Sequence, residues 1–212
     1  MPRRVRPLLP AACGPLALGP LVLGQLVLGP LVLGLLLLCQ PAGADWRAQW
    51  PVEQAPRLQG EGEVRYWGFS LYRARLWAPP QGYDSSQPYA LELVYARAIG
   101  RERIVSVSME EITRIYGDLP PAQAEQWRAR LAATLVDVHE GDRLIGLYLP
   151  GQGLRFYFAP VSDPGPSDER LLGQIDDEAL ARAFFGIWLD PQTRAPQLRA
   201  RLLGTLTGAG AR

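Results

Sequence analysis

The stretch LQGEGEVRYWGFSLYRARLWAPP, residues 58–80, decides the fold, because it holds two successive strand patterns. In its second half, FSLYRARLW, alternate side chains share a face. One face carries Phe69, Leu71, Arg73, Arg75 and Trp77, and the other carries Ser70, Tyr72, Ala74 and Leu76. Neither face is purely polar. The pattern therefore predicts a central strand of a sheet, covered on both sides.

Strand patterns return further along the chain, at residues 89–99, 142–150, 153–160 and 171–175. Pro150 to Gly153, with the sequence PGQG, form a hairpin turn between two of them. The aromatic residues on these strands indicate a large, partly hollow sheet face.

Helical patterns lie between and after the strands. Ser108 and Glu111 have the form of a capping box, which predicts a helix start. A second helix is expected after Pro120-Pro121, a third over 178–189 with Asp176 as its cap, and a last one that stops at Gly204. This order of elements predicts an α+β domain with helices against one face of an antiparallel sheet.

The first 44 residues differ sharply in composition from the rest. They contain three arginines, no acid and the five-residue repeats of PLALGPLVLGQLVLGPLVLGLLLLC at 15–39, whereas all 21 acids lie from Asp45 onward. A charged start, an apolar stretch and the small residues Ala42-Gly43-Ala44 are the parts of a secretory signal peptide. We therefore expect residues 1–44 to be a signal peptide cleaved before Asp45, and the domain to be periplasmic or secreted.

Two alternatives to cleavage stay open. The apolar stretch 16–38 exceeds the roughly 15 residues of an ordinary signal-peptide core. It reaches the roughly 20 residues that span a bilayer, so it could remain as an inner-membrane anchor and the chain's one membrane contact. Lipidation of Cys39 is less favoured, because Leu38 stands where a small residue is needed.

The composition after the leader excludes several kinds of site. Both cysteines lie in the leader, and all 22 basic residues are arginine; the chain contains neither lysine nor asparagine. Without the three leader arginines, 19 arginines face 21 acids, a net charge of −2. Nucleic acid would require a concentrated basic face. We expect no nucleic-acid partner, no metal site and no cofactor.

Three segments together resemble the bacterial branch of the chalcone isomerase-like family. They are residues 58–80, EGDRLIGLYLPGQGLRFYF at 140–158 and GQIDDEALARAFFGIWLDPQTRAPQLRARLLG at 173–204. The resemblance covers residues 57–204, between an irregular lead-in at 45–56 and a flexible tail at 205–212. It implies an open-faced β-sandwich, in which helices are layered on a large antiparallel sheet above an apolar cleft. Plant members cyclise chalcones, and other members bind fatty acids, so the family leaves enzyme and carrier both open.

The resemblance also suggests site residues. Catalytic members use an arginine on the first strand, a threonine on the second, and a helical group of tyrosine, lysine and asparagine. Tyr72 stands at the threonine position and Arg65 is the nearest counterpart of the arginine, but the helical group cannot be formed. No catalytic residue is therefore predicted.

Two more arginines are candidates on physical grounds. Arg73 and Arg75 share a strand face with aromatic residues, and a guanidinium in such surroundings can bind a carboxylate through two hydrogen bonds. The alternative is that they pair with sheet glutamates such as Glu92 or extend to the rim.

The remaining titratable groups favour ordinary roles. His139 is the single histidine and is expected to be a solvated turn residue, since one imidazole cannot form a zinc site; the alternative is axial ligation of a haem. The acidic pairs Glu110-Glu111 and Asp176-Asp177 are expected at helix starts, where the helix dipole favours anions.

The sequence thus predicts an exported domain that binds an apolar or amphipathic carboxylate, such as a fatty acid. The candidate ligand-binding residues are Arg65, Tyr72, Arg73 and Arg75. An isomerase of the chalcone–flavanone type, or another enzyme using the same cleft, is the alternative. A haem-binding protein or a purely structural interaction protein is the third option, and the oligomeric state is open.

Overall fold

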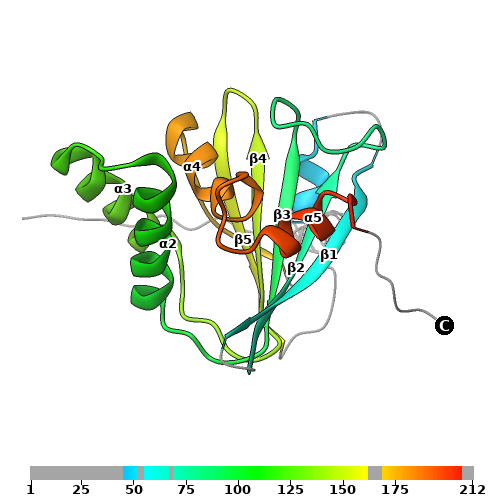
Figure 1. The fold of residues 1–212 in the computed structure, drawn as a ribbon, viewed down its shortest axis with the longest axis horizontal. Coiled ribbons are helices and arrows are strands. Elements are labelled where there is room, and N and C mark those ends of the chain that lie inside the picture. The colour runs from blue at the N-terminus through cyan, green and yellow to red at the C-terminus, as the bar shows by residue number, and fades with distance from the viewer. Residues whose placement is uncertain (1–44, 52–54, 67–68, 162–168, 207–212) are drawn as a thin grey trace, which may run out of the picture. The chain divides into compact units, whose positions relative to one another are not determined.

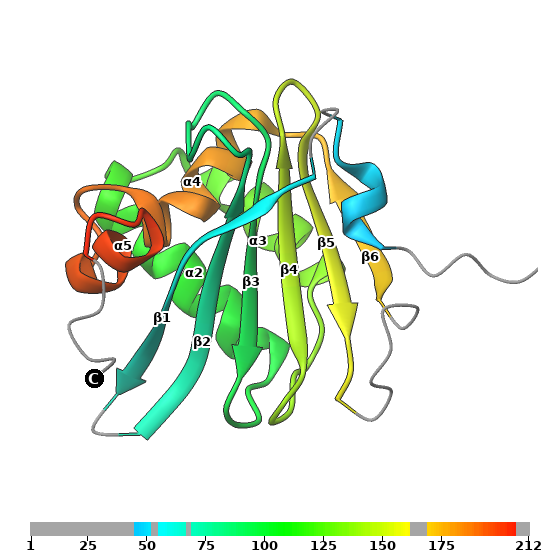
Figure 2. The same cartoon turned by 90° about the vertical axis from the view of Figure 1, so that its right-hand side faces the viewer.

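The strands form one antiparallel sheet with the order β1-β2-β3-β4-β5-β6, so every strand pairs with its neighbour in sequence. The computed structural model describes residues 45–51, 55–66, 69–161 and 169–206, all within the compact unit Ala42–Arg212. The strands are β1 (Arg57–Tyr66), β2 (Phe69–Ala78), β3 (Tyr89–Tyr95), β4 (Arg143–Leu149), β5 (Gly153–Ala159) and β6 (Arg170–Ile175). Figure 2 shows them side by side.

The α-helices pack on one face of this sheet (Figures 1 and 2). They are α2 (Arg101–Tyr116) and α3 (Pro121–Thr134), which connect β3 to β4, and α4 (Glu178–Leu189) and α5 (Pro196–Leu202), which follow β6. A short 3-10 helix, η1 (Trp46–Gln49), lies on the other face. The predicted α+β fold, an antiparallel sheet with helices layered on one face, is confirmed.

Strand alternation assigns each side chain to a face. On β2, Ala74 and Leu76 are fully buried against the helices, whereas Trp77 packs against the cluster on the opposite face. Both faces of β2 are thus occupied, as its sequence predicted.

Helix α5 crosses β1 at very close range. A Cβ atom on Gly60 would lie 2.7 Å from the carbonyl oxygen of Leu202, and nearer still to that of Arg201. One on Gly62 would lie 2.6 Å from the side chain of Leu198. The two glycines of the opening stretch therefore let the last helix rest directly on the sheet.

The start of α2 differs from the sequence prediction. The helix begins at Arg101 after Gly100, and the backbone N–H of Arg101 donates to Asp137 Oδ1 at 2.7 Å. Ser108 and Glu111 lie in the middle of α2 and are buried. The predicted capping box at these residues was wrong, as was the placement of the pair Glu110-Glu111 at a helix start.

Smaller differences concern other element ends. The cap of α4 is Asp177, whose Oδ1 accepts from the backbone N–H of Leu180 at 2.9 Å, rather than the predicted Asp176. Strand β3 ends at Tyr95, and Ile99 makes only an isolated bridge with Val138. The final helix ends before Gly204, which has a φ of 73°.

The leader, residues 1–44, lies outside the described residues, as does most of the predicted tail at 205–212. The expected signal peptide, the anchor at 16–38 and lipidation of Cys39 therefore stay predictions. Among the helices that the structure does describe, none has the length and apolar character needed to cross a membrane.

Candidate functional site

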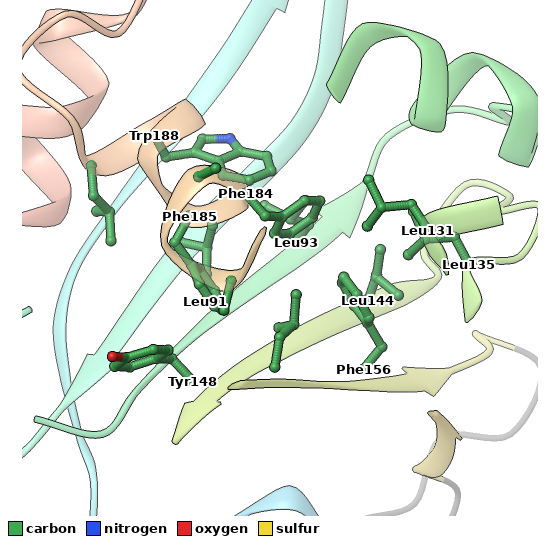
Figure 3. Close-up of a cluster of buried hydrophobic side chains, with 14 of the residues drawn as sticks. Leu91, Leu93, Leu131, Leu135, Leu144, Tyr148, Phe156, Phe184, Phe185 and Trp188 are labelled. Atoms are coloured by element: carbon green, nitrogen blue, oxygen red, sulfur yellow. The ribbon is translucent and has the colours of Figure 1, made fainter. Parts of the chain in front are cut away.

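A small apolar cavity lies between the sheet and α4. Its volume is about 10 Å³, close to the least that holds one water molecule. Every lining residue is apolar: Leu91, Leu93, Leu144, Gly146, Phe156, Phe184, Phe185 and Trp188. Figure 3 shows most of these side chains converging between β3, β4, β5 and α4. The partly hollow face predicted from the strand aromatics is thus almost filled by side chains.

Phe185 closes much of this space. Its ring stands over Gly146, where an added Cβ would lie 3.2 Å from the ring carbons. Phe184 packs edge-on against Phe156, with ring centroids 5.2 Å apart. An elongated ligand would have to displace these two phenylalanine side chains of α4.

A polar pair lies at one end of the cavity. The indole N–H of Trp188 on α4 donates to the hydroxyl oxygen of Tyr72 on β2 at 2.9 Å. The Tyr72 ring meets the ring of Tyr95 edge-on, with centroids 5.9 Å apart. Burial raises the pKa of Tyr72 to about 12 and also raises the pKa of Tyr95. Both phenols therefore stay protonated at neutral pH and can act as hydrogen-bond donors.

A buried carboxylate with two arginines lies on α2, the helix that packs against α4. Glu111 on α2 forms ion pairs with Arg114 and Arg194, each with a nitrogen–oxygen distance of 2.9 Å. The charge of Glu111 contributes to the raised pKa of Tyr72. Two guanidinium groups against one carboxylate leave one positive charge unbalanced within this trio.

The structure does not bring the four predicted ligand-binding residues together. Tyr72 lies on the helix face beside Trp188. Arg73 and Arg75 lie on the opposite face with Trp77, as strand alternation predicted. Arg65 is 66% exposed and pairs with Glu63 at 2.8 Å. The cleft between sheet and helices thus receives only Tyr72 of the four.

Arg75 takes the alternative role that the sequence left open. It pairs with Glu61 at 3.1 Å and lies 3.8 Å from the buried Glu92. Glu92 also accepts from the indole N–H of Trp77 at 3.0 Å. Binding roles for Arg65, Arg73 and Arg75 stay predictions, and the structure places all three away from the cleft.

Sequence reasoning missed the charged part of the site. Glu111 was assigned to a helix start, and Arg114 and Arg194 were not considered. The helical period of 3.6 residues places Glu111 on the same face of α2 as Ser108 and Ile112. This period was the signal that could have shown Glu111 to point inward. No sequence pattern links Glu111 to Arg194, which follows α4.

His139 lies outside the cleft. Its side chain is 75% exposed, and Nδ1 lies 3.5 Å from Asp142 Oδ2. The predicted solvated position is confirmed, and a haem in the cleft could not use this imidazole. Within the described part of the chain, no group of three or more histidine, cysteine, aspartate or glutamate residues is placed to hold a metal ion.

Comparisons with known proteins give distant likenesses. No family model matches the chain. An uncharacterized protein of Haemophilus influenzae is 25% identical over 146 residues, which cover 68% of this chain and 66% of the relative, just under two thirds of its length. A fatty-acid binding protein of Arabidopsis thaliana, known from its crystal structure, has a TM-score of 0.49 and 11% identity, covering 78% of this chain and 91% of that one. At these values neither likeness transfers a ligand or an activity to this chain, and the family resemblance of its sequence stays a prediction.

Proposed function

We propose that the domain binds an elongated apolar ligand with a carboxylate head group between the sheet and helices α2 and α4, without catalysing a reaction on it. One observation carries the proposal: an all-apolar cavity is lined by Trp188, whose indole bonds Tyr72, and the neighbouring helix α2 carries a buried carboxylate flanked by two arginines. Ligand sites are typically apolar with a few well-placed polar groups.

The chemistry of the head group follows from charge. Arg114 and Arg194 share Glu111, so a second carboxylate would find a guanidinium partner there. Tyr72 and Tyr95, whose rings meet edge-on, offer neutral hydroxyl donors on the helix face of the sheet. An uncharged head group would gain only the hydroxyl contacts.

The absence of catalysis is proposed on the composition of the chain. Lysine and asparagine belong to the helical group of the isomerases that the sequence resembles, and the chain contains neither. The buried tyrosines have raised pKa values, so they are poor bases at neutral pH.

Entry of the ligand requires the cavity to open. An acyl chain cannot fit into about 10 Å³, so the side chains of Phe184 and Phe185 must move as it enters. We expect binding to shift the fluorescence of Trp188, which lines the cavity.

The first experiment is extraction of the purified domain followed by mass spectrometry for bound lipid. The second is a titration with cis-parinaric acid, a fluorescent fatty acid, alongside the corresponding alcohol. Arg194→Gln should weaken binding of the acid about tenfold and leave binding of the alcohol nearly unchanged. Arg182→Gln is the matched control, because Arg182 is 67% exposed, Arg194 is 68% exposed, and each pairs with one glutamate.

A second candidate function follows from the small size of the cavity. If the domain carries no lipid and neither probe binds, the filled core is that of an interaction module without a small-molecule ligand. If the unchanged domain binds the acid and the alcohol equally well, it is a carrier of apolar molecules, and the carboxylate part of the proposal is refuted.

A further inference from the structure

The face of the sheet opposite the helices is covered by the segment that follows the leader. Trp46 is fully buried and Trp50 is nearly so. Both pack with Ile145, Leu147 and Tyr157 in a core cluster of their own. The helix η1 that carries Trp46 is capped by Asp45, whose carboxylate accepts from the backbone N–H of Arg47 at 2.9 Å. Residues 45–50 are therefore fixed on the sheet.

A buried glutamate beside this segment is only partly satisfied. Glu169 is 3% exposed, and its Oε1 lies 3.2 Å from Arg143 Nη1 and 3.8 Å from Arg47 Nη1. Its Oε2 is buried and has no hydrogen-bond partner in the described part of the chain. Burial raises the pKa of this carboxyl group. A bare buried carboxylate oxygen is costly, so a missing donor is expected.

The charges around Glu169 are unequal in number. Ion pairs link one continuous row of side chains: Asp45, Arg47, Glu169, Arg143, Glu92, Arg75 and Glu61. The row contains four carboxylates and three guanidinium groups. One further cation would balance it.

Asp45 ends this row, where its carboxylate pairs with Arg47 at 3.6 Å, and its backbone nitrogen would become a cation if the chain began there. The carboxylate of Asp45 and the backbone N–H of Trp46 both act on the pKa of Glu169, the first raising it and the second lowering it. The nitrogen of Asp45 is the next one along the chain. The sequence predicts signal-peptide cleavage directly before this residue.

We propose that cleavage before Asp45 creates an α-ammonium group that pairs with Oε2 of Glu169, so that removal of the leader completes the ion-pair row on this face. A signal peptidase would hydrolyse the Ala44–Asp45 bond with one water molecule, leaving a carboxylate on Ala44 and an amino group on Asp45. The free amino group is protonated at neutral pH, whereas the peptide nitrogen of the uncleaved chain carries no charge. This inference concerns the face opposite the proposed ligand site and is independent of it.

The absence of lysine makes the amino group directly measurable. A domain that begins at Asp45 contains one amine, its own N-terminus, because no lysine occurs anywhere in the chain. Reductive methylation followed by intact mass measurement therefore reports on this group alone. The domain should be released from a fusion partner without extra residues and compared with a domain carrying one added glycine before Asp45.

We expect the amino group of the folded domain that begins at Asp45 to react at least about tenfold more slowly than in the same chain unfolded in urea, as an ion pair shields it. The domain with the added glycine should show a much smaller difference. Equal protection in the two folded domains, or none in either, would overturn the proposal.

A stability measurement provides the second arm. Acetylation of the Asp45 amino group should lower the folding equilibrium constant by about tenfold in the unchanged domain, because it removes the charge beside a buried carboxylate. In Glu169→Gln the same acetylation should have less than about a twofold effect. Glu61→Gln, at the exposed end of the row, is the control and should keep the full acetylation effect. If acetylation has the same effect with and without Glu169, the two groups do not pair. If Glu169→Gln fails to fold, the labelling experiment alone decides whether the proposal holds.

Discussion

Trp188 Nε1 donates to the hydroxyl oxygen of Tyr72 across the interface between α4 and β2, at 2.9 Å. This is a direct polar bond between the helix layer and the sheet, beside a cavity whose lining is all apolar. It joins α4 to β2, and it marks the polar end of the cavity.

Tyr72→Phe should destabilise the domain by about 1–3 kcal/mol, because the nearly buried indole N–H of Trp188 loses its acceptor. Urea unfolding followed by circular dichroism measures the change. Tyr95→Phe is the control, since it removes the neighbouring hydroxyl without taking an acceptor from Trp188, and it should cost clearly less. An equal loss in the two variants would show that the indole bond has no special weight.

Alkaline pH should unfold the domain through its tyrosines. Burial raises the pKa of Tyr72 and Tyr83 to about 12, from an ordinary value near 10. Between these two pH values the folded state holds more protons than the unfolded state, so stability falls as pH rises. Residues 45–212 contain no lysine or cysteine, and arginine stays charged, so apart from an N-terminal amino group the tyrosines account for the loss.

The measurement is urea unfolding in steps from about pH 9 to about pH 11.5, with tyrosinate absorbance recorded in parallel. Most tyrosinate should appear together with unfolding. A gradual rise near pH 10 while the circular dichroism spectrum stays native would mean that these phenols are accessible in the folded state.

Local patterns predicted the faces of β2 but not what covers them. Alternation correctly placed Arg73 and Arg75 with Trp77, and Tyr72 with Ala74. Which face receives the helices depends on contacts between distant segments. Three arginines were therefore candidates for the cleft, one of which was expected to hold the ligand head group, and the structure places all three elsewhere.

The same limit explains the helix ends and the charged part of the site. Ser108 and Glu111 fit a local capping rule, but the N–H group at the true start of α2 binds Asp137, 36 positions further along the chain. Glu111 instead pairs with Arg194 beyond α4. The lead-in at 45–56 looked irregular because a single short turn carries no periodicity, yet it contains the fully buried Trp46.

Gly60→Ala should displace α5 from the sheet. The new methyl group would meet the carbonyl oxygens of Arg201 and Leu202, which are backbone atoms and cannot rotate away. We expect a loss near the upper end of the 1–3 kcal/mol range for overpacking, together with faster proteolysis at the C-terminus. Gly62→Ala is the matched control, because it meets the side chain of Leu198, which can change rotamer. A larger loss for Gly62→Ala would contradict the close approach of β1 and α5.

Glu92→Ala should be among the most damaging single changes on the face opposite the helices. The carboxylate is 2% exposed, accepts from Trp77 at 3.0 Å and lies 3.3 Å from Arg143 Nη1. Its removal leaves the indole N–H of Trp77 without an acceptor and takes one carboxylate partner from Arg143. Breaking a buried pair in this way costs about 3–5 kcal/mol.

Glu61→Ala removes the carboxylate at the outer end of the same row, where the side chain is 46% exposed. Solvent screens that pair, so the loss should stay below about 1 kcal/mol. Urea unfolding of both variants at low and at high salt separates the two cases, because salt should reduce the effect of Glu61 more than that of Glu92. Similar losses at both positions would mean that burial does not strengthen the inner pairs, and the row would then be an ordinary surface network.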